Sequence, residues 1–208
     1  MRVSERLLKL SAHEAFFLLK NSLAIPRLQY ILRSSPCCLS SELLSLDEEV
    51  RRILSSVLNL RLDSGTWTQA SLPVRWGGIG VRSASALAPS AFLASATASA
   101  TLIATLLLGC HAPPADECFE AACTHWASLA GVAFPPGQSE GPIPQRVLDD
   151  GICSALSNEL LLQADPVNRA RLLASLAPVR DPGCRPCLPT TWDSDWETMS
   201  CASRWVSG

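Results

Sequence analysis

Apolar side chains recur every three or four residues over most of the first 60 positions, which is the spacing of one face of an α-helix. The clearest pattern predicts a helix over 42–60 that is capped by Ser40 or Ser41. Its apolar positions fall close to a heptad seam, and they are Leu43, Leu46, Val50, Ile53, Leu54, Val57 and Leu58. The charged residues expected outside this seam are Asp47, Glu48, Glu49, Arg51 and Arg52.

Two helices are predicted before it. The first covers 4–22, and the residues near its apolar face are Leu7, Leu8, Ala15, Leu18 and Leu19. Ser11 and Glu14 form a capping-box pattern, which is compatible with a break near residue 11. The second begins with Pro26 in its first turn and ends at about Ser34. We expect its buried side chains to be Leu28 and Ile31, and its outward ones Arg27 and Arg33.

A glycine-rich stretch over 72–82 follows a turn predicted at 63–65. Its characteristic residues are Pro73, Trp76, Gly77, Gly78 and Gly80. Glycine permits positive φ and close backbone approach. We therefore predict a structural loop that turns tightly and leads into a helix. Ser83 or Ser85 can cap that helix. The spacing of the glycines fits neither of the common phosphate-binding loops.

No charged residue occurs between Ser83 and Ala115. This run is rich in Ala, Ser and Thr, Pro89 interrupts it early, and only residues 102–108 are strongly apolar. We therefore predict a buried helix, or a pair of helices, in a soluble core, and consider a membrane unlikely as a partner. The alternative is a small membrane-associated protein that uses residues 86–108.

Further helices are predicted over 116–130 and 145–163, between proline-rich loops. The inward positions of the second are Val147, Leu148, Ile152, Leu156 and Leu160. A last helix begins at Asp165-Pro166 and ends before Pro178. Residues after 180 show no periodicity, so we expect a disordered tail.

The composition agrees with an α-rich fold, since Leu, Ala and Ser dominate and 48% of residues are hydrophobic. Residues 1–82 hold eleven Lys/Arg and seven Asp/Glu, whereas residues 83–208 hold six and twelve. A basic N-terminal part suits contact with a polyanion. Nine cysteines and a charged start without a secretory signal indicate reduced thiols in an intracellular protein.

Four segments together resemble the region downstream of the palm in reverse transcriptases of invertebrate non-LTR retrotransposons. They are HEAFFLLK (13–20), IPRLQYILRSSPC (25–37), LPVRWGGIGVRSA (72–84) and AFLAS (91–95). The resemblance covers residues 7–109, and extends loosely over 145–177, where ARLLA follows Arg169. It rests on the order and spacing of the segments, because no single motif is decisive.

The resemblance implies a thumb, a helical element that grips the template–primer duplex. Phosphate contacts need Lys and Arg without sequence reading, and the candidates are Arg2, Arg6, Lys9, Lys20, Arg27 and Arg33. The implied partners are an RNA or DNA duplex, bound weakly and non-specifically, and a missing palm and fingers. Because the palm carries the metal-binding carboxylates in that family, we expect no polymerase activity, no catalytic residue and no cofactor.

The predicted organisation is a mostly α irregular helical bundle in four parts. Residues 1–62 form a basic thumb-like bundle, 63–82 a glycine-rich connecting loop, 83–178 a helical extension with proline-rich loops, and 179–208 an irregular tail. One permitted back-translation of the tail, read in a shifted frame, gives the apolar rhythm that the tail lacks. We hypothesise that the tail is an out-of-frame remnant.

Other residues with potential chemistry are better explained without a site. Asp149 and Asp150 resemble a polymerase carboxylate pair, but they lie in an amphipathic helical pattern and are predicted to be solvated. A zinc site from Cys110, His111, Cys118, Cys123 and His125 has no standard finger spacing. Cys184 and Cys187 have the spacing of a metal or redox pair but lack a second pair. We therefore predict no metal site.

One further function class remains open at the level of sequence. A helical protein-interaction module would use apolar surface left bare where a palm domain packs. The nucleic-acid interpretation predicts that the affinity for a duplex falls steeply as the salt concentration rises, and this dependence distinguishes it from a protein-interaction module.

Overall fold

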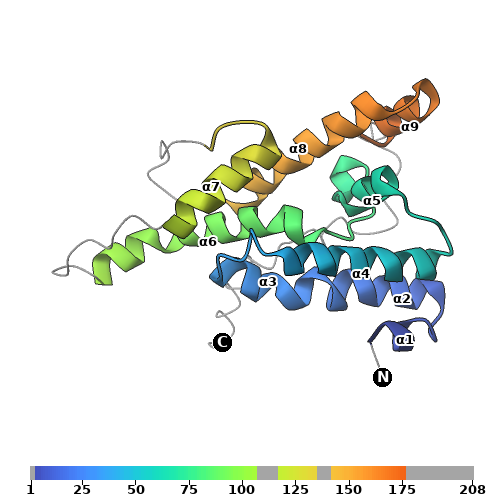
Figure 1. Ribbon diagram of the computed structural model, residues 1–208, viewed down its shortest axis with the longest axis horizontal. Helices are drawn as coiled ribbons and strands as arrows, with labels where there is room; N and C mark the ends of the chain where they lie inside the picture. Colours follow the sequence, from blue (N-terminus) through green and yellow to red (C-terminus); the bar gives the residue numbers. More distant parts are fainter. Residues whose placement is uncertain (1–2, 107–116, 135–141, 177–208) are drawn as a thin grey trace, which may run out of the picture. The chain divides into compact units, whose positions relative to one another are not determined.

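The computed structural model describes residues 3–106, 117–134 and 142–176, and every regular element among them is helical (Figure 1). The elements are α1 Val3–Leu7, α2 Ala12–Leu18, the π-helix η1 Leu19–Leu23, α3 Ile25–Ser34, α4 Ser41–Leu58, α5 Ser64–Ser71, the 3-10 helix η2 Val74–Trp76, α6 Ala84–Leu106, α7 Glu117–Ala130, α8 Gln145–Gln163 and α9 Pro166–Leu176. The predicted mostly helical fold class is confirmed. The predicted tail lies outside the described residues.

Local capping signals set several helix ends. Ser11 caps α2, and the Glu14 carboxylate accepts a hydrogen bond from the backbone N–H of Ser11 at 3.1 Å, so the capping box is present. The expected helix over 4–22 is therefore split into α1 and α2, and it continues as η1. Because α1 ends at Leu7, the next residue, Leu8, is exposed rather than on the apolar face. At the end of α4, Asn59 takes the left-handed conformation with φ 50°.

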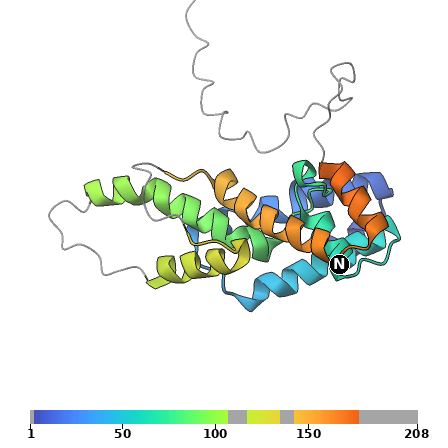
Figure 2. The same ribbon diagram turned by 90° about the horizontal axis from the view of Figure 1, so that it is seen from above.

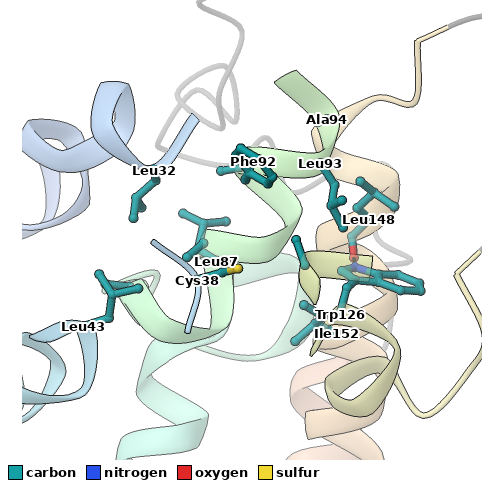
Figure 3. Close-up of a cluster of buried hydrophobic side chains, with 14 of the residues drawn as sticks. Leu32, Cys38, Leu43, Leu87, Phe92, Leu93, Ala94, Trp126, Leu148 and Ile152 are labelled. Atoms are coloured by element: carbon teal, nitrogen blue, oxygen red, sulfur yellow. Dashed lines mark hydrogen bonds between the residues drawn. The ribbon is translucent and has the colours of Figure 1, made fainter. Parts of the chain in front are cut away.

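Two hydrophobic clusters hold the described helices together. One joins α1, α2, η1, α4 and α5 with Val81 of the glycine loop, and its residue Leu54 is fully buried. The other gathers α3, the start of α4, α6, α7 and α8 (Figure 3), with the indole of Trp126 at its α7 side. Leu46 of α4 packs against both clusters, so this helix links them.

Helix α6 is the central element of the second cluster. It packs against α3 and α4, and also against α7 and α8, which lie beside it in Figure 2. Residues 84–94, its first half, are buried or half-buried, and Pro89 lies inside the helix without ending it. The second half is exposed at Leu102 and Leu106, so the prediction of a buried helix holds only for the first half. No helix in the described ranges combines the length and apolar character that crossing a membrane requires.

Two helices bury a different face from the one predicted. In α3, Leu32 is 1% exposed and Ile31 is 49% exposed, because the stripe that faces the core runs through Leu28 and Leu32. Arg33, expected outside, is half-buried beside that stripe. In α8, Val147 is exposed, since the buried stripe runs through Leu148 and Ile152.

The segment 63–82, expected as a connecting loop, contains a helix. Asp63 accepts a hydrogen bond from the backbone N–H of Thr66 at 2.7 Å and so caps α5. The predicted turn at 63–65 is therefore a helix start.

Candidate functional site

The glycine loop (residues 72–82) turns back on itself between α5 and α6. The carbonyl of Pro73 accepts hydrogen bonds from the N–H groups of Trp76 at 2.8 Å and Gly78 at 3.2 Å. Gly77 has φ 75°, a left-handed conformation that favours glycine. A Cβ on Gly78 would overlap the carbonyl oxygen of Leu72. These two positions therefore require glycine, and the turn places the side chains of Arg75 and Trp76 against α8.

Asp150 of α8 receives three hydrogen bonds from the loop on one oxygen. The donors to its Oδ1 are the indole N–H of Trp76 at 2.9 Å and two nitrogens of Arg75, at 3.0 and 2.7 Å. Partial burial raises the pKa of Asp150, but the hydrogen bonds from Trp76 and Arg75, together with the positive charges of Arg75 and Arg146, leave the pKa below its ordinary value. Asp150 is therefore held as a carboxylate by the loop.

Asp149, the preceding residue, is only 7% exposed and forms an ion pair with Arg82. The Arg82 guanidinium also donates to the carbonyl of Ser71 at 3.0 Å, and Arg75 lies 3.7 Å from the second oxygen of Asp149. Burial raises the pKa of Asp149, and Arg82 and Arg75 oppose this rise. We call Arg75, Trp76, Arg82, Asp149 and Asp150 the arginine–aspartate junction.

The prediction that Asp149 and Asp150 are solvated helix carboxylates is wrong. Helix α8 turns this pair toward the loop, where the two carboxylates bind two arginines that lie more than 65 residues earlier in the chain. The sequence contained both halves of the junction, an Asp pair and two loop arginines. It held no local signal that joins them, because residues so far apart meet only through tertiary packing.

A second buried carboxylate fixes the start of α6. Asp47 of α4 accepts hydrogen bonds from the backbone N–H of Ala84 at 2.6 Å and of Ser85 at 3.0 Å. The hydroxyls of Ser83 and Ser85 donate to it at 2.7 and 2.6 Å. Ser83 in turn accepts from the N–H of Ala86 at 3.2 Å, which is the helix cap predicted from the sequence.

Asp47 was expected outside the α4 seam, and it is buried at 7% exposure. The reason is that its carboxylate replaces water for four donors at the N-terminus of α6, where the helix dipole also favours a negative charge. The segment 75–85 is thus fastened to two helices, to α8 through Arg75, Trp76 and Arg82 and to α4 through residues 83–85.

The junction carboxylates are engaged by guanidinium and indole groups, so their chemistry is that of structural ion pairs. Beside them, burial raises the pKa of the Cys153 thiol to about 11, which keeps it protonated and unreactive at neutral pH.

The cysteines and histidines that were rejected as metal ligands from the sequence are only partly described. Cys110 and His111 lie outside the described residues, as do Cys184 and Cys187. Cys118 is exposed on α7, and Cys123 and His125 are half-buried on the same helix. In residues 3–106, 117–134 and 142–176, no three His, Cys, Asp or Glu side chains gather in a way that could hold a metal ion.

The predicted phosphate-contacting cations lie on α1, the turn after it, η1 and α3. Arg6, Lys9 and Arg27 are exposed, and Lys20 and Arg33 are half-buried. The Lys20 ammonium lies close to Gly80, where an added Cβ would be 2.9 Å from its Nζ. Arg2 lies outside the described residues.

Most of these cations differ from the ion-paired arginines of the chain, and among the described residues they share the lack of an ion pair with Arg61, Arg169 and Arg171. Across the part of the chain that the structure describes, Arg6, Lys9, Lys20 and Arg27 form no ion pair. The arginines that do form ion pairs with carboxylates are Arg51, Arg52, Arg75, Arg82 and Arg146. Residues 1–36 contain six Lys/Arg and two Asp/Glu, so the positive charge of residues 1–82 is concentrated there.

Comparison with known proteins adds no family to this description. No protein-family model, curated protein or solved structure matches the chain. The molecule is therefore defined by its fold class, an α-helical protein, and by the two carboxylate anchors of its glycine loop.

Proposed function

We propose that this chain binds the phosphate backbone of an RNA or DNA duplex, weakly and without sequence preference. The contacts come from the predicted set, Arg2, Arg6, Lys9, Lys20, Arg27 and Arg33. The chain contributes no catalytic step, and its role is that of a thumb-like gripping element, as the resemblance to post-palm segments of reverse transcriptases implies.

The observation that carries this proposal is that, among the described residues, exposed cations without an ion pair are concentrated in residues 1–36, which hold six Lys/Arg and two Asp/Glu. The junction and α4 use their arginines in ion pairs within the protein, whereas Arg6, Lys9 and Arg27 are exposed and form none among the described residues. Exposed, unneutralised cations retain the charge that releases counterions from a nucleic acid. Helix α3 contains no acidic residue at all, so nothing on it repels a phosphate.

Weak and non-specific binding follows from the kind of contacts available. Lys and Arg contacts to phosphates position a protein on a duplex but do not read bases. Dissociation constants of about 10⁻⁴ to 10⁻⁶ M are typical of such binding at physiological salt. The aspartates of the junction are occupied by Arg75 and Arg82, which supports a binding role without metal-dependent chemistry.

Charge reversal of the exposed cations tests the proposal. The triple variant Arg6→Glu, Lys9→Glu, Arg27→Glu is expected to bind a fluorescein-labelled RNA–DNA duplex at least tenfold more weakly than the wild type at about 50 mM salt, because three phosphate contacts become repulsions. Fluorescence anisotropy of the full chain measures both affinities, and duplexes of unrelated sequence should show the same loss.

The matched control changes the same amount of charge elsewhere. Arg61, Arg169 and Arg171 are also exposed, and the variant with Glu at all three positions has the same net charge as the triple variant above. We expect this control to reduce affinity by much less than the test variant. Equal losses in both would show that net charge, and not this surface, determines binding, and the proposal would then be wrong.

A further inference from the structure

Helix α3 presents an exposed stripe of unusual composition. Its members, spaced at three and four residues, are Arg27, Tyr30, Ile31 and Ser34. The side chain of Tyr30 is 80% exposed, and Ile31 is 49% exposed. Tyr30 is the single tyrosine of the chain. An aromatic ring and a guanidinium therefore lie one helical turn apart on a helix that contains no acidic residue.

The opposite side of α3 is firmly held. Leu32 is buried in the second hydrophobic cluster against α6, and the amide of Gln29 donates to Gln145 of α8 at 3.2 Å. The stripe is thus displayed by a helix that is fixed on two neighbours. An exposed aromatic side chain next to a cation on a fixed helix is suited to a ligand that offers a flat π face and an anion a few ångströms apart.

A nucleotide that is not paired offers this combination. Bases inside a duplex are stacked on each other and do not present their faces, whereas an unpaired base can stack on an aromatic side chain while its phosphate meets an arginine. We infer that Tyr30 and Arg27 form a stacking position for an unpaired nucleotide that adjoins the duplex. This inference rests on the proposed function, and it adds the single-stranded segment as a second part of the ligand.

The expected consequence is a preference for duplexes with overhangs. The wild-type chain should bind an RNA–DNA duplex carrying a three-nucleotide single-stranded overhang about fivefold more tightly than the blunt duplex, since one base stacked on an aromatic side chain typically gives at least this factor. Anisotropy titrations of the two labelled duplexes at the same salt concentration measure the ratio.

Variants at one position then test the residue. In Tyr30→Ala the ratio of the two affinities should fall to about one, and in Tyr30→Phe it should be retained, because stacking needs the ring and not the hydroxyl. The matched control is Leu162→Ala, which removes an 82% exposed apolar side chain from α8 and should leave the ratio as in the wild type.

The outcomes separate this inference from the proposed function. Equal binding of blunt and overhanging duplexes by the wild type, with the usual salt dependence, overturns the inference and leaves the proposed function standing. A ratio that persists in Tyr30→Ala also overturns it. If neither duplex binds at low salt, both proposals fail, and the stripe on α3 would then be assigned to a protein partner.

Discussion

Arg82→Ala should lower the free energy of unfolding by about 3–5 kcal/mol, the range for breaking a buried ion pair from one side. The substitution leaves Asp149, whose side chain is 10% exposed, without its main counter-charge, and it removes the hydrogen bond to the Ser71 carbonyl. Urea unfolding of the full chain at pH 7, followed by circular dichroism, gives the free energies. The matched control is Arg52→Ala, which breaks an exposed pair with Glu49 and should leave the midpoint nearly unchanged.

The pH dependence of this loss has a defined sign. Burial already places the pKa of Asp149 above its ordinary value, and the loss of Arg82, which lowers that pKa, raises it further. A protonated Asp149 is neutral and needs no counter-charge. The deficit of Arg82→Ala relative to the wild type is therefore largest above the raised pKa, and it shrinks as pH falls through that value.

Replacing both members of the pair distinguishes the free-energy cost of an unpaired buried charge from the cost of lost packing. The double variant Arg82→Leu, Asp149→Leu should recover most of the stability, because two apolar side chains leave no unpaired charge in the junction. A loss of less than about 1 kcal/mol in Arg82→Ala, within the range of an exposed pair, would contradict the assignment of the junction as a buried anchor.

Asp47→Ala should destabilise the protein by about 3 kcal/mol. The carboxylate of Asp47 accepts from two backbone N–H groups and two hydroxyls at the start of α6. Its removal leaves buried donors unpaired, each of which costs about 1–3 kcal/mol unless water reaches it, and it removes a helix cap. The same urea unfolding measurement applies.

Two comparisons give this second prediction its specificity. Ser83→Ala removes the local cap and one of the four donors to Asp47, and it should cost about 1–2 kcal/mol, less than Asp47→Ala. Glu48→Ala changes the neighbouring carboxylate, whose side chain is 70% exposed, and should have little effect. Similar midpoints for Asp47→Ala and Glu48→Ala would mean that Asp47 does not anchor α6.

Much of the fold could be predicted from local signals. The helix over 145–163 has the bounds of α8, and the proline in the first turn of α3, the Ser11 capping box and the Ser83 cap are present as expected. These features depend on residues within one or two turns of each other, so the sequence alone determines them.

The incorrect predictions concern residues whose burial depends on partners that are distant in the sequence. Ile31 was expected inside and Leu32 faces the core, because the position of α6 selects which of two adjacent apolar residues is buried. Asp47 and Asp149 were assigned to the solvent, as isolated helix carboxylates usually are. Each is buried because donors from a segment 36 or more residues away replace water. The apolar periodicity within one helix cannot indicate a hydrogen-bond donor that comes from another segment.

The candidate site was predictable only in part. The basic character of residues 1–36 could be read from composition. Arg6, Lys9 and Arg27 were candidate phosphate contacts, and the structure exposes all three. Lys20 and Arg33 are half-buried, because η1 and α3 pack against their neighbours on those sides. The exposed ring of Tyr30 was missed, although its spacing of three residues from Arg27 was visible in the sequence.

The salt dependence of duplex binding tests the central claim most directly. If four or five of the predicted cations contact phosphates, a plot of log affinity against log salt for a DNA duplex should have a slope of about −4, since each contact contributes about −0.9. Titrations of the full chain between about 50 and 200 mM salt cover the useful range. A slope of this size supports a phosphate-binding surface. A slope near zero, or no binding at the lowest salt, would contradict it.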